Sequence, residues 1–154
     1  MLIKNIRHVG VVTLDIKKSV NFYKNILGLK IFEKSTHNHV SLGKIMKLKN
    51  VCINIVRLKS KVNNITIELL DWKNPKSKSI NKKNIYSQGL THIALTVNDL
   101  QKVYEKLINN KIEVLSDPVF GSNKRTKYMF CKSPENVFIE LVQDLKKNNN
   151  NFYN

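Results

Sequence analysis

An internal repeat constrains the fold of this chain more than any other feature of its sequence. The segment HVGVV, which begins at His8, matches the segment HIALT, which begins at His92, 84 residues later. Seven residues after each histidine stands an aspartate, Asp15 or Asp99, which precedes a stretch with apolar residues at helical spacing. Aspartate is a preferred N-cap, so each copy predicts a strand followed by a capped helix. Because 154 residues are too few for two full-size domains, the repeat indicates two half-size modules of one design.

Both copies continue with further strands. The helices are predicted over 15–27 and 99–110, with Gly28 and Asn110 as C-terminal stops. Apolar runs predict strands over 29–33, 51–59 and 65–72 in the first copy, and over 111–115, 127–132 and 137–143 in the second. Asn64 and Asn136 each lie four residues before a glutamate, where a hairpin turn requires a positive φ. The order βαβββ, present twice, predicts an α+β fold.

The composition along the chain divides it into four segments. We predict a first module over 1–72, a linker rich in Lys, Ser and Asn over 73–88, a second module over 89–145 and a polar tail over 146–154. The sequence has no apolar run long enough for a transmembrane helix, and its start lacks the features of a signal peptide. The two cysteines, Cys52 and Cys131, fall in apolar strands and are predicted to be inert core thiols. A cytoplasmic protein without a membrane partner is the resulting prediction.

Strand alternation places one histidine or glutamate on the open face of each of four strands. Successive side chains of a strand point to opposite faces of the sheet. In each of these strands one face is aliphatic and suits cover by a helix, whereas the other carries His8, Glu68, His92 or Glu140. The two histidines occupy equivalent positions of the repeat, and so do the two glutamates. One such residue is usually structural or solvated, but four at matched positions indicate a shared site.

The chemistry of these four side chains suits a divalent metal ion. If the two modules pair with their open sheet faces toward each other, two imidazoles and two carboxylates converge on one cavity. Mixed nitrogen and oxygen ligation of this kind leaves coordination positions open for a substrate, and the two carboxylates balance the charge of the ion. His37 and His39, by contrast, lie in a polar stretch without a third ligand and are predicted to be solvated.

The strong positive charge does not indicate nucleic-acid binding. The net charge is +16, but 24 of the 27 basic residues are lysines, scattered along a chain that also holds 21 Asn and 16 Ile. A dedicated nucleic-acid binder favours Arg for bidentate contacts and interleaves its basic cluster with aromatic residues. We therefore expect a small-molecule partner, and the charge favours an anionic one. Arg57, Arg125 and Lys127 are candidates to hold its anionic group, although each also fits a solvated face.

Four stretches of the chain resemble the vicinal oxygen chelate superfamily, which includes glyoxalase I, methylmalonyl-CoA epimerase, extradiol dioxygenases and bleomycin-resistance proteins. They are IRHVGVVTLDIKKSVNFYKNILGLKIF, TIELLDW, GLTHIALTVNDLQKVYEKL and YMFCKSPENVFIEL. The resemblance implies that the two modules pair into a curved, mostly antiparallel eight-stranded sheet around a central metal. The positions that match the family's ligands are His8, Glu68, His92 and Glu140. It also implies a homodimer, with modules that pair within one chain or are exchanged between two.

The resemblance further implies an enzyme of the glyoxalase I type, a lyase or isomerase. Such an enzyme uses a divalent ion (Ni, Co, Mn, Zn or Mg) to assist proton transfer next to a carbonyl, through an enediolate or enolate. Glu140 or Glu68 would then be the catalytic base, with Glu140 favoured by analogy. The alternatives are an epimerase that acts on an acyl-CoA thioester, a ring-cleaving dioxygenase, and a non-catalytic, resistance-type protein that binds a small molecule.

Some positions depart from the pattern of individual family members. Glyoxalase I has an arginine for glutathione where this chain has Val12, and an asparagine where Trp72 stands. Methylmalonyl-CoA epimerases usually have glutamine in place of Glu68 and a catalytic glutamate on the preceding strand, whereas 51–57 contains no carboxylate. Ring-cleaving dioxygenases use two histidines and one glutamate, so Glu68 would be a surplus ligand. The substrate, and whether glutathione or CoA is used, therefore stay open.

Overall fold

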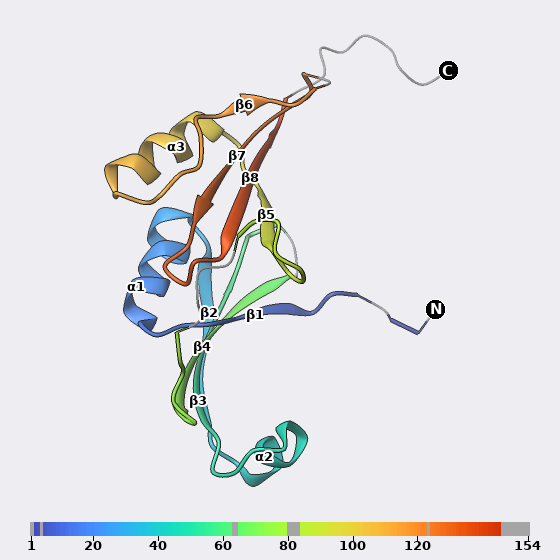
Figure 1. The fold of residues 1–154 in the computed structure, drawn as a ribbon, viewed down its shortest axis with the longest axis vertical. Helices are drawn as coiled ribbons and strands as arrows, with labels where there is room; N and C mark the ends of the chain where they lie inside the picture. The colour runs from blue at the N-terminus through green and yellow to red at the C-terminus, as the bar shows by residue number, and fades with distance from the viewer. Residues whose placement is uncertain (1, 4, 63–64, 80–83, 123, 146–154) are drawn as a thin grey trace. The chain divides into compact units, whose positions relative to one another are not determined.

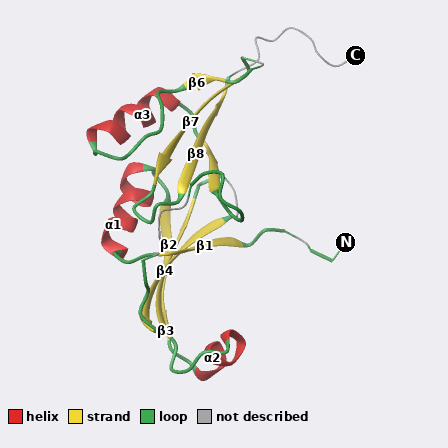
Figure 2. Cartoon of the chain, in the orientation of Figure 1, coloured by secondary structure: helices red, strands yellow, loops and turns green. Residues whose placement is uncertain are grey.

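The fold was analysed in a computed structural model that describes residues 2–3, 5–62, 65–79, 84–122 and 124–145 (Figure 1). The chain divides into two compact units, Met1–Asn81 and Lys82–Asn154. Each unit contains one four-stranded sheet and helical segments, which confirms the predicted α+β class (Figure 2). The tail predicted over 146–154 and the turn residue Asn64 lie outside the described residues. The joining of the two sheets around one cavity stays a prediction.

The first unit has the strand order β1-β4-β3-β2. Its elements are β1 (His8–Val12), α1 (Ile16–Val20), the π-helical segment η1 (Asn21–Ile26), β2 (Lys30–His37), α2 (Val40–Met46), β3 (Cys52–Lys59) and β4 (Thr66–Asn74). β1 pairs with β4 in parallel, and the other two pairings are antiparallel. β4 thus runs two residues into the segment predicted as a linker.

The second unit repeats this arrangement with the strand order β5-β8-β7-β6. Its elements are β5 (His92–Thr96), α3 (Leu100–Asn109), β6 (Val119–Phe120), β7 (Thr126–Lys132) and β8 (Phe138–Asp144). β5 pairs with β8 in parallel, and the other pairings are antiparallel. The sequence repeat therefore corresponds to two copies of one topology.

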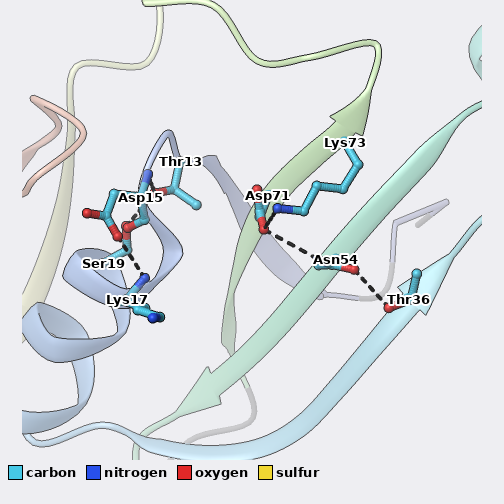
Figure 3. Close-up of polar contacts among 8 residues, drawn as sticks. All are labelled: Thr13, Asp15, Lys17, Ser19, Thr36, Asn54, Asp71 and Lys73. Atoms are coloured by element: carbon cyan, nitrogen blue, oxygen red, sulfur yellow. Dashed lines mark hydrogen bonds and ion pairs between the residues drawn. The ribbon is translucent and has the colours of Figure 1, made fainter.

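The predicted N-caps are confirmed in both units. The side chain of Asp15 accepts hydrogen bonds from the backbone N–H of Lys17, which Figure 3 shows, and of Lys18, each at 3.0 Å. The Asp99 side chain accepts one from the Lys102 N–H at 3.1 Å, and this hydrogen bond lowers the pKa of the Asp99 carboxyl. A carboxylate in this position satisfies N–H groups that have no partner within the helix.

The C-terminal half of the first predicted helix is wider than an α-helix. In η1 the N–H of Leu27 donates to the carbonyl of Phe22, five residues earlier, and Gly28 follows with a φ of 81°. Phe22, Tyr23 and Ile26 of this segment are all buried. The positive φ is the conformation that glycine adopts without a steric penalty, so Gly28 ends the helix as predicted.

Two predictions of secondary structure were wrong. The helix α2 lies in the polar stretch after β2, where no helix was predicted, because it is short and lacks a side-chain cap. The strand predicted over 111–115 is reduced to a single bridge between Val114 and Cys131. Lys111 has a φ of 55°, which breaks the extended conformation, and the edge strand of this sheet is instead β6.

The aliphatic face of each sheet forms the core of its unit, as predicted. In the first unit it contributes Val11, Leu58, Ile67 and Leu69, with Phe22, Tyr23 and Ile26 from the helical segment. In the second unit this face contributes Met129, Cys131, Ile139 and Leu141, with Leu100 and Leu107 from α3. Because this burial fixes which side chains point inward, it also fixes which point to the opposite, open face of each sheet.

One row of polar residues interrupts the aliphatic face of the first sheet. Asp71 follows Ile67 and Leu69 on the same face of β4 and is buried. Its carboxylate pairs with Lys73 at 2.8 Å and accepts a hydrogen bond from Asn54, whose amide oxygen accepts one from Thr36 (Figure 3). The prediction that this face of β4 is wholly aliphatic is therefore wrong at Asp71.

Within the described parts of the chain, no helix is long and apolar enough to span a membrane.

Candidate functional site

In the first unit the parallel pairing of β1 and β4 brings His8 and Glu68 together. Gly10 lies in register with Glu68, so His8 stands two residues away on the same face. The His8 Nδ1 atom is 3.5 Å from the Glu68 Oε1 atom. The imidazole is 42% exposed, whereas the glutamate side chain is only 10% exposed. The pair therefore consists of a carboxylate set into the sheet and an accessible ring beside it.

The second unit builds the same pair from β5 and β8. Ala94 lies in register with Glu140, and His92 precedes it by two residues on the same face. The His92 Nε2 atom is 3.5 Å from the Glu140 Oε2 atom, and the two side chains are 40% and 24% exposed. The structure thus brings each predicted histidine beside its predicted glutamate in both units.

A small residue stands opposite the glutamate in both pairs. A Cβ atom added to Gly10 would meet the Leu70 Cδ1 atom at 3.3 Å, and the equivalent residue of the second unit is Ala94. Imidazole nitrogen and carboxylate oxygen are good ligands for divalent ions, so each pair fits half of the predicted ligand set. Among the described residues no three His, Cys, Asp or Glu side chains gather closely enough to hold a metal ion, so the complete set of four stays a prediction.

The two pairs differ in the residue that faces the glutamate from the next strand. In the first unit this residue is Arg57 of β3, whose Nε–H donates to Glu68 Oε1 at 2.5 Å. Its Nη1 also donates to Glu33 of β2. The hydrogen bond to Glu68 raises the pKa of the Arg57 guanidinium, which therefore stays charged. Glu68 already has a cationic partner in this structure.

In the second unit the equivalent position is Phe130 of β7. Its ring stands edge-on to the His92 ring, with 5.6 Å between the centroids and an angle of 84°. Glu140 thus has an aromatic neighbour where Glu68 has a guanidinium. The two pairs share one backbone geometry, but a positive charge lies beside the first glutamate and an aromatic ring beside the second.

A comparison with protein families identifies the fold. The family model described as Glyoxalase/Bleomycin resistance protein/Dioxygenase superfamily matches residues 5–141. The chain belongs to this superfamily. Because the description joins enzymes with resistance proteins, membership establishes the fold and leaves the individual reaction open.

Proteins with similar sequences align with nearly the whole chain. An uncharacterized protein of Bacillus subtilis, YwkD, is 26% identical over 146 residues, which cover 93% of this chain and 99% of that protein. The mitochondrial methylmalonyl-CoA epimerase of Dictyostelium discoideum is 28% identical over 145 residues, covering 92% and 79%. The crystal structure of a glyoxalase family protein from Bacillus cereus superposes with a TM-score of 0.85 at 17% identity, over 94% of this chain and 96% of that one.

The two positions that depart from glyoxalase I have different surroundings. Val12 is 47% exposed at the end of β1. Trp72 packs against an apolar cluster, so its role in the structure is packing. This cluster consists of Val51, Ile53 and Ile55, with Leu42 and Leu70 beside it.

Sequence reasoning missed two residues that shape the pairs, Glu33 and Phe130. Glu33 ends a predicted strand, and Phe130 lies within one, but only the cross-strand register connects them to the pairs. Arg57 was predicted as a candidate to bind the anionic group of a small-molecule partner, and the structure places it beside Glu68.

The remaining candidate residues lie apart from the pairs. His37 contacts Ser35 at 3.0 Å and His39 contacts Ser41 at 2.6 Å. The Lys127 ammonium lies over the Phe120 ring, 4.6 Å from its centroid.

Proposed function

We propose that this chain is a divalent-metal-dependent lyase or isomerase of the glyoxalase-like type, which moves a proton next to a carbonyl group. The observation that carries the proposal is the His–Glu pair with the same 3.5 Å separation on the parallel strands of both units. Each pair supplies half of one ligand set, made of His8, Glu68, His92 and Glu140. The partner is a small, anionic molecule, the assembly is a homodimer and the location is the cytoplasm.

The ion in such a site supplies Lewis-acid stabilisation of the negative charge that develops on a carbonyl oxygen. The identity of the ion (Ni, Co, Mn, Zn or Mg) is part of the test. The residues of the chain supply the ligands and the group that accepts the proton. A carboxylate beside a cation and a partly apolar wall is a suitable general base near neutral pH.

Glu140 is the better candidate for that base, with Glu68 as the second. Glu68 accepts a hydrogen bond from Arg57, which restrains its carboxylate. Glu140 is more exposed and faces Phe130 instead. A carboxylate that no guanidinium restrains can move more readily toward a substrate proton. We therefore assign proton transfer to Glu140 and a mainly ligating role to Glu68.

Metal content is the first measurement. The purified protein is stripped of metal, and Ni²⁺, Co²⁺, Mn²⁺, Zn²⁺ and Mg²⁺ are returned separately, while stoichiometry and melting temperature are recorded. We expect about one ion per chain, and at a hundredfold excess over Kd a stabilisation of about 2.7 kcal/mol. Glu140→Gln and His92→Ala should abolish the shift. Glu105→Gln, on α3, is the matched control that should retain it.

Turnover is then followed as exchange of the substrate proton with deuterium in ²H₂O, with hemithioacetals, acyl thioesters and 2-oxo acids as candidates. Glu140→Gln should lose exchange while it keeps the fold. No metal binding, or binding unchanged in the His92→Ala and Glu140→Gln variants, would refute the metalloenzyme proposal.

Two other functions have a specific observation in their favour. An epimerase acting on an acyl-CoA thioester is favoured by the similarity to the Dictyostelium enzyme, and exchange at C2 of a branched acyl-CoA would select it. A non-catalytic protein that binds a small molecule is favoured by the Arg57–Glu68 contact, which occupies one of the four ligands. Ligand binding without metal and without proton exchange would support this non-catalytic function.

A further inference from the structure

Arg57 holds two carboxylates at once across three neighbouring strands. The register places Glu33 of β2, Arg57 of β3 and Glu68 of β4 in one row on the open face of the first sheet. The guanidinium donates through Nε to Glu68 and through Nη1 to Glu33, and its side chain is 22% exposed. A guanidinium carries five N–H donors, so two carboxylates leave donors unused.

The second carboxylate makes the contact with Glu68 exchangeable. The row of two glutamates and one arginine carries a net charge of −1, so it still attracts a cation. If a divalent ion draws Glu68 away, Arg57 keeps Glu33 as its partner and is not left as an uncompensated charge, which is the costly outcome for a partly buried ion. The Nε–H that donated to Glu68 is then free for another acceptor, next to His8 and Glu68.

We propose that Arg57 is the residue that selects an anionic substrate, and that metal binding uncovers it. In the metal-free protein Arg57 holds Glu68. When Glu68 ligates a divalent cation, Arg57 stays paired with Glu33 and offers its Nε–H to a carboxylate of the substrate. This inference rests on the proposed function and extends it to the substrate class, a small 2-oxo compound with a carboxylate.

The mechanism requires that three events are thermodynamically coupled: metal binding to Glu68, release of Glu68 by Arg57, and anion binding to Arg57. Arg57 competes with the cation for Glu68, so removal of Arg57 strengthens metal binding. Glu33 is the alternative partner, so removal of its charge leaves Arg57 more firmly on Glu68 and weakens metal binding. Because coupling between two ligands is reciprocal, metal and anion should each strengthen the binding of the other. The second unit has Phe130 at the equivalent position and offers no such group.

The metal part of the test uses Co²⁺ titrated calorimetrically into the stripped protein. We expect Arg57→Met to bind Co²⁺ about tenfold more tightly than the wild type, and Glu33→Gln about fivefold more weakly. In the double variant the Glu33→Gln effect should vanish, because Glu33 acts only through Arg57. Simple addition of the two effects would instead indicate a general electrostatic field. Lys106→Met removes a cation from the exposed side of α3 in the second unit and should leave Co²⁺ affinity unchanged.

The anion part compares pyruvate with pyruvamide, its neutral amide, on the Co²⁺-loaded protein. Wild type should prefer pyruvate by about tenfold, and Arg57→Met should lose that preference while Lys106→Met keeps it. Circular dichroism checks the fold of each variant. If Arg57→Met does not fold, Arg57→Lys serves instead, because its single ammonium cannot reproduce the two-sided contact and should also strengthen Co²⁺ binding.

Two results would overturn the inference while the proposed function stands: unchanged or weaker Co²⁺ binding in Arg57→Met, or an unchanged preference for pyruvate. Absence of Co²⁺ binding in the wild type would overturn both. Failure of the proposed function is therefore seen in the wild type, whereas failure of the inference alone is seen in the variants.

Discussion

The two glutamates of the repeated pairs should respond differently to the same substitution in metal-free protein. Glu68→Gln removes the charge that accepts the Arg57 hydrogen bond at 2.5 Å, in a side chain that is 10% exposed. A hydrogen bond to a charged group contributes about 1.5–3 kcal/mol. Arg57 keeps Glu33 and is partly solvated, so we expect a loss of about 1–2 kcal/mol. Glu140→Gln removes no guanidinium contact and should change the free energy of unfolding by less than about 0.5 kcal/mol.

Urea denaturation with a chelator present measures this difference. Trp72 is the only tryptophan of the chain and lies in the first unit, so its fluorescence reports on the unit that contains Glu68. With an m value of about 1 kcal/mol/M for so small a unit, Glu68→Gln should lower the midpoint by about 1–2 M. Circular dichroism of Glu140→Gln should show an unchanged transition. Equal losses in the two variants, or none in Glu68→Gln, would refute the assigned asymmetry between the pairs.

Three further predictions concern the scaffold. Burial raises the pKa of the Cys131 thiol to about 12, so a thiol reagent at pH 8 should label Cys52 and reach Cys131 only after unfolding, as counted by mass spectrometry. Asp15→Ala removes an N-cap with two hydrogen bonds and should cost about 1 kcal/mol in urea denaturation. Gly43→Ala should destabilise by about 1–3 kcal/mol, because the new Cβ would lie 2.6 Å from the backbone oxygen of Leu48; an unchanged midpoint would show that this loop moves at no cost.

The repeat, the caps and the strand faces could be predicted because they depend on local patterns. Asp15 and Asp99 identify helix starts, and the positive φ of Asn136 (59°) confirms the turn predicted there. The alternation of Ile139 and Leu141 with Glu140 identifies the face on which the glutamate lies. Burial of an aliphatic face fixes these features without reference to distant residues.

The chemistry around the pairs could not be predicted in the same way. Arg57 and Glu33 are 24 residues apart, and only the register of β2 on β3 brings them together. A bulge between Ile31 and Glu33 shifts that register, and no pattern in the sequence indicates it. For the same reason, nothing in the sequence shows that Phe130 and Arg57 occupy equivalent positions.

The pairs and their neighbours are under different physical constraints, which explains why the family fixes the fold and leaves the reaction open. A one-residue slip of β4 would move Glu68 to the buried face and bring Ile67 and Leu69 into solvent, so the core itself holds the glutamate in place. The residue that faces the glutamate from the next antiparallel strand lies on the open face and contributes little to this core. One unit can therefore carry Arg57 and the other Phe130 on the same backbone. A change of that single residue alters the charge beside the pair while the packing that maintains the pair is preserved.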